Sequence, residues 1–220
     1  MKKLIKAGLL IGLIFFMTGS AWALPIDAGD TVKLSVGGDA MYTMTNVNTN
    51  DDWDKYYTFC LESDIRFWAD TKYRVESVED YAKSGGIDNQ GPYNDDPNWV
   101  SGDNKDYISD QTKWLFATYL TNPNAYNAWD VQQAIWWLED EARGVESYWT
   151  PFFNLANGDY SVTGWDIKAI NLVYDGIHGT YDIQSQLVGS YNPVPEPATM
   201  ILFGIGLLGI AGMGRKKLNK

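Results

Sequence analysis

The chain has 220 residues, 28 acidic and 17 basic, and its formal net charge is −11. The two ends carry seven of the basic residues and one acidic residue, which leaves 27 acidic and 10 basic residues between them and a formal charge of −17. A domain so acidic, with no basic cluster, is a poor candidate for nucleic acid or anionic lipid. Its roughly 170 residues, rich in aromatic side chains, are enough for one well-buried core.

The first segment, residues 1–23, has the organisation of a secretory signal peptide. Three lysines lie before an apolar run from Ala7 to Met17, and Ala21-Trp22-Ala23 is a small-x-small cleavage site. The apolar run of about 11 residues is well short of the roughly 20 that cross a bilayer as a helix. We therefore expect cleavage rather than a permanent anchor, with the mature protein beginning near Leu24.

Alternating polar and apolar residues predict strands at the start of the mature domain. The predicted segments are Thr31–Val36, Ala40–Val47, Tyr56–Glu62 and Lys72–Val78. In the third of these, Phe59 lies on the more apolar face, while Thr58, Cys60 and Glu62 share the other. Cys60 is therefore expected to face away from the most apolar side.

Residues 85–106 are rich in Asp, Asn, Gly and Pro, a composition typical of loops. Clustered carboxylates and amides suit a hard cation such as calcium. No part of this stretch has the spaced calcium-loop pattern with a central Gly and a final Glu. The prediction for residues 85–106 is therefore a solvated loop, with calcium binding as the alternative.

Helices are predicted after this loop. Ser109 or Asp110 can cap a helix that runs to about Leu120. A second helix is expected from about Ala125 to Arg143, with Gly144 ending it. Positions 129, 132, 136 and 139 of that helix fall on one face.

A short helix around Ser147–Ala156 and two more strands, Trp165–Tyr174 and Tyr181–Val188, complete the mature domain. We expect a single α+β domain over residues 24–192, with β-sandwich or barrel-like strands around a helical insertion. A signal helix precedes it and a transmembrane helix follows it. The chain's only histidine, His178, lies in a predicted loop without partner motifs, so no role is assigned to it.

The last segment, residues 193–220, has a distinctive order. Pro195, Glu196 and Pro197 are followed by an apolar stretch of about 16 residues, which spans roughly 24 Å as a helix and suits a temporary anchor. Basic residues follow, among them Arg215, Lys216 and Lys217. They are expected to stay in the cytoplasm.

This order resembles the PEP-CTERM sorting signal of Gram-negative bacteria. The resemblance implies transient anchoring in the inner membrane by the C-terminal helix. It also implies cleavage by an exosortase-type enzyme and a destination at the cell surface or in the extracellular matrix.

Two short motifs lie within the mature domain. Phe59-Cys60-Leu61-Glu62 is aromatic-Cys-apolar-acidic, and it contains the chain's only cysteine. Val131-Gln132-Gln133-Ala134-Ile135-Trp136 is apolar-Gln-x-x-apolar-Trp. A lone thiol in an oxidising compartment cannot form an internal disulfide and is open to oxidation. Together the two motifs resemble the thioester domain of bacterial surface adhesins.

The resemblance implies an internal thioester between Cys60 and Gln132, formed with loss of ammonia. The family glutamine lies four residues before the tryptophan, which selects Gln132; Gln133 would point about 100° away on the helix. Such a bond transfers its acyl group once to an amine on a surface or matrix target, such as a lysine. We therefore expect an adhesion protein without enzymatic turnover, cofactor or metal. The ordinary alternative is a small buried cysteine and a solvent-facing glutamine.

Water would compete for a thioester, and neighbouring aromatic side chains can exclude it. Phe59, Trp136 and Trp137 are candidates for this shielding, with core packing as the alternative role, favoured for Trp137. Glu62 and Glu139 can assist proton transfer, although the simpler expectation for both is a surface charge.

Two other functions compete with the thioester hypothesis. A carbohydrate-binding domain would stack sugar rings on Trp53, Trp99 or Trp149 and would bind independently of Cys60. A structural matrix protein would carry an unreactive thiol.

Overall fold

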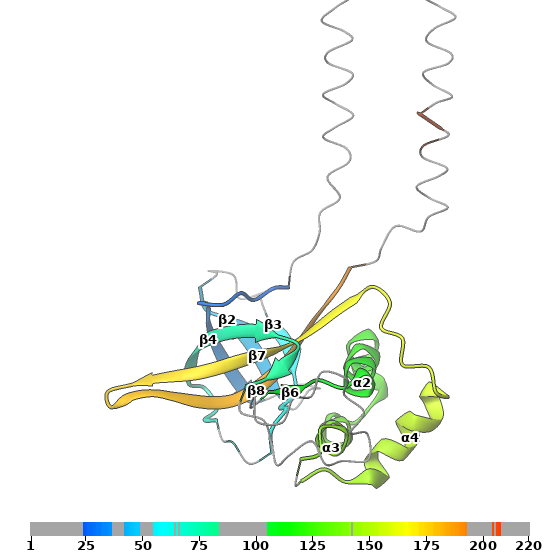
Figure 1. Cartoon of the computed structure of the whole chain (residues 1–220), viewed down its shortest axis with the longest axis horizontal. Helices are drawn as coiled ribbons and strands as arrows, with labels where there is room; N and C mark the ends of the chain where they lie inside the picture. Colours follow the sequence, from blue (N-terminus) through cyan, green and yellow to red (C-terminus); the bar gives the residue numbers. More distant parts are fainter. Residues whose placement is uncertain are drawn as a thin grey trace, which may run out of the picture.

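The computed structural model describes residues 24–36, 42–48, 55–63, 65, 67–83, 105–141 and 143–192, with positions 204, 206 and 207 of the tail. Sheet dominates the described residues, and the helices lie between the strands in sequence (Figure 1). This confirms the expected mixture of strands with a helical segment between them. Among the described residues, the helices are all too short or too polar to cross a membrane.

The main sheet has six strands in the order β3-β2-β1-β4-β7-β8, and every neighbouring pair is antiparallel. Its members are β1 Thr31–Val36, β2 Tyr42–Asn46, β3 Lys55–Thr58, β4 Lys72–Glu79, β7 Trp165–Gly176 and β8 Gly179–Tyr191. A second, two-stranded sheet pairs β5 Tyr81–Ala82 with β6 Asp106–Tyr107. The strands of the main sheet thus lie where the alternation predicts them, except that regular pairing in β3 ends before Cys60, and the short strands β5 and β6 were not predicted.

The residues directly after β3 join the two outermost strands of the six. The Leu187 N–H donates to the Phe59 carbonyl over 2.9 Å, and the Leu61 N–H donates to the Ser185 carbonyl over 3.0 Å. Cys60 and Gln186 lie opposite each other as an antiparallel bridge. The chain after β3 is therefore hydrogen-bonded to β8 on either side of Cys60, so the two outermost strands are joined there.

Three helices pack together beside the sheet (Figure 1). They are α2 Asp110–Thr121, α3 Ala128–Leu138 and α4 Glu146–Ala156, with a 3-10 turn η1 at Pro123–Ala125. Of the two predicted capping residues, Ser109 caps α2, where its side chain accepts from the Thr112 N–H. The expected helix from Ala125 to Arg143 is shorter, because Asn127 caps its start through the N–H groups of Trp129 and Asp130.

The end of α3 also differs from the prediction, and Gly144 does not stop the helix. The helix ends at Leu138, and Asp140 adopts a left-handed φ of 65°. The chain then folds back, and the Glu141 N–H donates to the Trp136 carbonyl over 2.7 Å. A Cβ on Gly144 would lie 2.2 Å from the Trp137 nitrogen, so glycine is required by this close backbone approach.

Two apolar clusters form the core. One joins the three helices to the facing side of the sheet and includes Phe59, Phe116 and Leu187. The other is built from strand residues alone, apart from Ile26, and has Tyr56 packed against it. Successive residues of β3 and its continuation thus point alternately to the helix side and to the strand-lined side.

Several predictions concern segments outside the described residues: the signal peptide, the sorting residues of the tail, Trp53 and Trp99. Most of the predicted loop at 85–106 also lies outside them; its last residue, Asp106, belongs to β6. Within the described part of the chain, no group of three or more His, Cys, Asp or Glu side chains has the arrangement of a metal site.

Candidate functional site

The position of Cys60 follows from the register between the β3 continuation and β8. On either side of Cys60, the Phe59 carbonyl accepts from the Leu187 N–H and the Leu61 N–H donates to the Ser185 carbonyl. Cys60 and Gln186 therefore form a non-hydrogen-bonded antiparallel pair, the kind in which Cα atoms approach to about 4.5 Å and the side chains lie closest. The register thus brings the Gln186 side chain to the thiol.

The Cys60 sulfur contacts the amide of Gln186. The Gln186 Nε2 lies 3.4 Å from the Cys60 Sγ, and the Gln186 Oε1 lies 3.9 Å from it. The single O–H of Thr58 is shared between two acceptors, the Leu187 carbonyl at 2.8 Å and the same Oε1 at 3.3 Å. Thr58, Cys60 and Gln186 are all essentially inaccessible to solvent, so this cluster is closed.

Gln132 approaches Cys60 from α3 and binds its main chain. The Cys60 N–H donates to the Gln132 Oε1 over 2.8 Å, and the Gln132 Nε2 donates to the Cys60 carbonyl over 2.8 Å. The Gln132 amide thus binds the main-chain N–H and carbonyl of Cys60, which point away from β8. It takes the place that a neighbouring strand would occupy. The two predicted motifs do meet in the structure, through the backbone of Cys60, while the hydrogen bonds of the sulfur itself go to Gln186.

The expected orientation of Cys60 agrees with this arrangement in one respect. Phe59 belongs to the helix-side cluster, so Cys60 points to the opposite side, as the alternation predicts. That opposite side is buried as well, since only 2% of Cys60 is exposed.

The sequence motifs gave no prediction for Gln186. A signal was nevertheless present in the sequence: Gln184-Ser185-Gln186 places three polar residues inside the predicted strand Tyr181–Val188. All three are buried in the structure. Buried polar side chains require partners, so such a run indicates a polar network rather than a solvent-facing edge.

Aromatic residues surround the cysteine region. The Phe59 ring is fully buried and meets the Tyr119 ring edge-on at 4.9 Å between centroids. Trp136 is 4% exposed and lies edge-on to Trp129 at 6.2 Å. Trp137 is half-buried and packs against the helix-side core, the role predicted for it. The contacts of Phe59 are those of a core residue on the helix side, the face opposite the Cys60 side chain, and the ring contact of Trp136 is with Trp129.

The prediction of surface charges at Glu62 and Glu139 is wrong, because tertiary packing buries both. Glu62 is fully buried, and its Oε2 accepts the Ser185 N–H over 2.5 Å. Glu139 is 7% exposed, and its Oε1 accepts from the Ser109 hydroxyl over 2.8 Å and from the Ser109 N–H over 3.2 Å. The first of these carboxyls therefore fixes β8 beside the Cys60 segment, and the second fixes the start of α2.

These carboxyls belong to a buried acidic cluster with Asp106 and Glu141. Burial raises the pKa of Glu62 to about 8, and it also raises the pKa of Glu139. Burial, followed by the charges of Glu139 and Glu141, raises the pKa of Asp106 to about 9. Burial raises the pKa of the Cys60 thiol to about 12. The hydrogen bond from Gln186 lowers this pKa, and the charge of Glu62 raises it by a smaller amount. The thiol is therefore protonated at neutral pH.

We predict that the protein loses stability as the pH rises from about 5 to about 9. The pKa values of Glu62 and Asp106 are higher in the folded protein than their ordinary values of 4.5 and 3.8. The folded state therefore binds more protons than the unfolded state in this range, and its unfolding free energy falls until the folded pKa values are passed. Urea unfolding at pH 5, 7 and 9 measures this change.

Asp106→Asn is the control for the pH prediction, because it removes one buried acid while keeping its shape. The variant should show a smaller loss of unfolding free energy between pH 5 and 9. An unfolding free energy that is constant, or that increases with pH, in the unsubstituted protein would contradict the prediction.

Two further residues from the sequence analysis have defined positions. Trp149 is only 2% exposed and packs against Phe152, so it cannot offer a face to a sugar ring in the carbohydrate-binding hypothesis. His178 lies in the turn between β7 and β8, in agreement with the predicted loop.

Comparison with known proteins identifies the tail. Residues 193–216 match the family model of the PEP-CTERM protein-sorting motif, which contains Pro195, Glu196 and Pro197 together with Arg215 and Lys216. The chain is therefore an exported protein with a C-terminal membrane-anchoring sorting tail, and an exosortase is its processing partner. No curated protein and no solved structure matches the chain.

Proposed function

We propose that this exported protein forms an internal thioester at Cys60 and uses it to attach covalently to an amine on a surface or matrix target. One observation carries the proposal: the Cys60 sulfur lies against a glutamine side-chain amide, 3.4 Å from its nitrogen and 3.9 Å from its oxygen, in a closed site. Held side by side in this way, a thiol and an amide gain a large effective concentration. The hydrogen bonds between β8 and the chain after β3 support a barrel-like domain, which would hold Cys60 and Gln186 rigidly in place.

The acyl donor in this proposal is Gln186. Its amide contacts the sulfur, whereas the amide of Gln132 is occupied by the Cys60 main chain. Gln132 then acts as a positioning residue that holds the cysteine segment against α3. The motif resemblance favours a bond to Gln132 instead, and the same hydrogen bonds keep Gln132 close enough to remain the second candidate.

The formation step needs no external reactant. The Cys60 sulfur attacks the side-chain carbonyl carbon of Gln186, the S–C bond forms, the C–N bond breaks, and the thiol proton leaves with the nitrogen as ammonia. In the second step an amine attacks the same carbon. A C–N amide bond forms, the C–S bond breaks, and the Cys60 sulfur recovers a proton from the amine. Each molecule reacts once, so the process is not turnover.

Thr58 has a defined part in both steps. Its hydroxyl donates to the Gln186 Oε1, the oxygen on which negative charge develops when the carbonyl carbon is attacked. We predict that Thr58→Val, which keeps the shape and removes this shared donor, slows thioester formation by about a hundredfold. The measurement is the fraction of protein lacking one ammonia as a function of time after refolding. An unchanged rate would remove Thr58 from the mechanism.

The destination of the protein supports an amine target. The sorting motif carries the protein out of the cell, where lysine side chains and amino sugars of neighbouring surfaces are accessible. Within the protein, the Cys60 thiol and the Gln186 amide are themselves buried, at 2% and 0% exposure, so bulk water does not reach the bond until the site opens to a target.

Treatment of the purified exported protein with methylamine tests the proposal and identifies the acyl donor. Methylamine should release a titratable Cys60 thiol and leave a methylamide on one glutamine, which tandem mass spectrometry of peptides locates. We expect the methylamide on Gln186. A methylamide on Gln132 would reassign the bond to the motif glutamine, and a protein with a free thiol and no methylamide would support the structural matrix protein instead.

A further inference from the structure

A cavity of about 630 Å³ lies between α2, the segment before β7, the first residue of β7 and the last residue of β8. Its walls include three aromatic side chains, Trp114, Trp165 and Tyr191. The volume lies within the range of sites that bind small molecules. None of Thr58, Cys60 and Gln186 lines this cavity, so it is separate from the thioester site.

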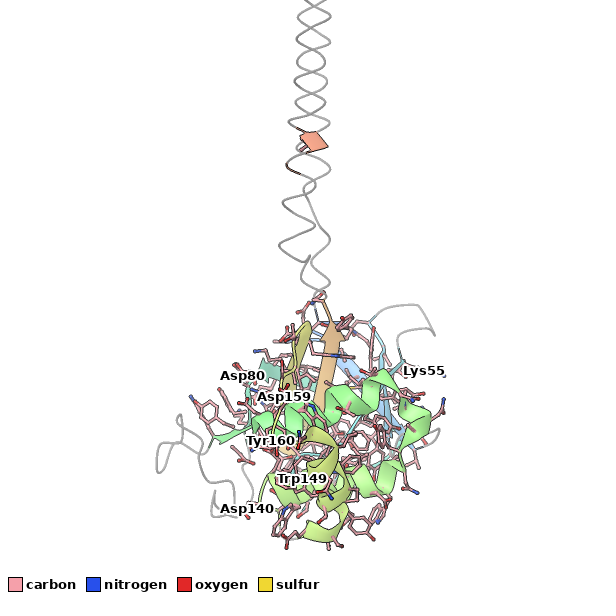
Figure 2. All side chains as sticks on the ribbon, turned by 90° about the vertical axis from the view of Figure 1, so that its right-hand side faces the viewer. Lys55, Asp80, Asp140, Trp149, Asp159 and Tyr160 are labelled. Carbon is pink, nitrogen blue, oxygen red and sulfur yellow. The ribbon has the colours of Figure 1, made fainter. Side chains whose placement is uncertain are left out.

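The aromatic walls are held in place by other rings. Trp114 meets Trp149 and Tyr160 edge-on, at 6.3 and 6.0 Å between centroids. Trp149, which belongs to α4, and Tyr160, which follows that helix, are labelled in Figure 2, and their ring centroids lie 6.2 Å apart. Trp165 and Tyr191 are cross-strand partners, and their rings lie 5.2 Å apart. The cavity thus presents rigid aromatic surfaces that need little ordering when a ligand binds.

Hydroxyl groups supply the polar part of the lining. They belong to Thr118 and Thr121 on α2 and to Ser161 and Thr163 on the segment before β7. The Ser161 and Thr163 hydroxyls lie 2.8 Å apart, and the Thr121 hydroxyl donates to the Ala117 carbonyl. Each hydroxyl has two acceptor lone pairs and one donor, so these groups keep capacity for a ligand after their internal bonds.

The lining contains no acidic or basic side chain, although the domain between the two ends has a formal charge of −17 from 27 acidic and 10 basic residues. A charged ligand would therefore find no counter-charge in the cavity. A neutral ligand with one apolar face and a rim of hydroxyl groups matches aromatic walls and hydroxyl donors together. Sugar rings have this combination, since their C–H faces stack on aromatic rings and their hydroxyls form hydrogen bonds.

We propose that the cavity between Trp114, Trp165 and Tyr191 binds neutral sugar rings of an extracellular polysaccharide. This site differs from the one expected from Trp149, which is buried. Reversible binding here would be independent of the thioester and would hold the protein on a glycan surface.

Isothermal titration of the purified exported protein with cellohexaose, mannohexaose and chitohexaose tests the proposal. We expect at least one of these neutral oligosaccharides to bind. Trp165→Ala should weaken that binding at least tenfold, and Thr118→Val, which removes one hydroxyl at constant shape, should weaken it several-fold. Trp68→Ala is the matched control, because Trp68 is 62% exposed and does not line the cavity.

Binding of none of the three oligosaccharides would overturn the proposal. Binding that survives Trp165→Ala, or that is lost equally in Trp68→Ala, would also overturn it. Cys60→Ala should bind as well as the unsubstituted protein, so a failure of the thioester proposal would leave this result unchanged. Near-ultraviolet circular dichroism of each variant verifies that the aromatic packing is retained.

Discussion

Replacement of Gly144 by alanine is expected to lower the unfolding free energy by about 3 kcal/mol or more. The new Cβ would lie 2.2 Å from the Trp137 nitrogen and 2.4 Å from the Trp136 carbonyl carbon. Both atoms belong to the backbone of α3 and cannot turn aside as a side chain can. The segment after Gly144 would have to move, and with it the contact between α3 and α4. Urea unfolding monitored by circular dichroism measures the loss.

Gly176→Ala is the matched control for this prediction. Its Cβ would lie 3.2 Å from the Tyr174 ring and 3.3 Å from the Tyr181 ring. Both tyrosines are exposed side chains, so they can shift at little cost. We expect this variant to lose less than about 1 kcal/mol. Equal losses in the two variants would contradict the close approach of Gly144 to α3.

Gln186→Glu is expected to abolish thioester formation completely, while Gln132→Glu is expected to permit it. A glutamate side chain has the shape of glutamine but no amide nitrogen to leave as ammonia. In Gln186→Glu the acyl donor is lost, so Cys60 should remain a free thiol in every molecule. In Gln132→Glu one oxygen can still accept the Cys60 N–H, and only the donor to the Cys60 carbonyl is lost.

Mass spectrometry and thiol titration of both variants decide between the two glutamines. Gln132→Glu should also be less stable by about 1 to 3 kcal/mol, because it disturbs a buried hydrogen-bonded pair. The reverse pattern, with a thioester in Gln186→Glu and none in Gln132→Glu, would assign the bond to Gln132 as the motif predicts.

Local sequence patterns predicted the elements around the site well. Alternation located the strand that leads to Cys60, and the capping preference of Ser109 located the start of α2. These features depend on residues close together in the chain. The two motifs also meet, since the Gln132 amide binds the main chain of Cys60.

The partner of the sulfur depends instead on the register between two strands far apart in sequence. Gln186 lies opposite Cys60 because main-chain hydrogen bonds fix β8 against the continuation of β3 at Phe59 and Leu61. A shift by one residue would turn Gln186 to the other face. No short motif contains that information.

The buried carboxyls were missed for a related reason. Glutamate and aspartate are normally exposed, so composition alone places Glu62 and Glu139 at the surface. Their burial is the result of packing between the β3 continuation, β8 and the ends of α2 and α3. Likewise, the need for glycine at position 144 arises from a tertiary approach to α3 and not from the end of a helix.

The most direct test of the thioester is the intact mass of the purified exported protein, measured under denaturing conditions without added amines. We predict a mass smaller by one ammonia than the processed sequence requires, and no thiol that reacts with a titrating reagent. The deficit should be absent in Cys60→Ala. A full mass together with one freely titrating thiol in the unsubstituted protein would contradict the account.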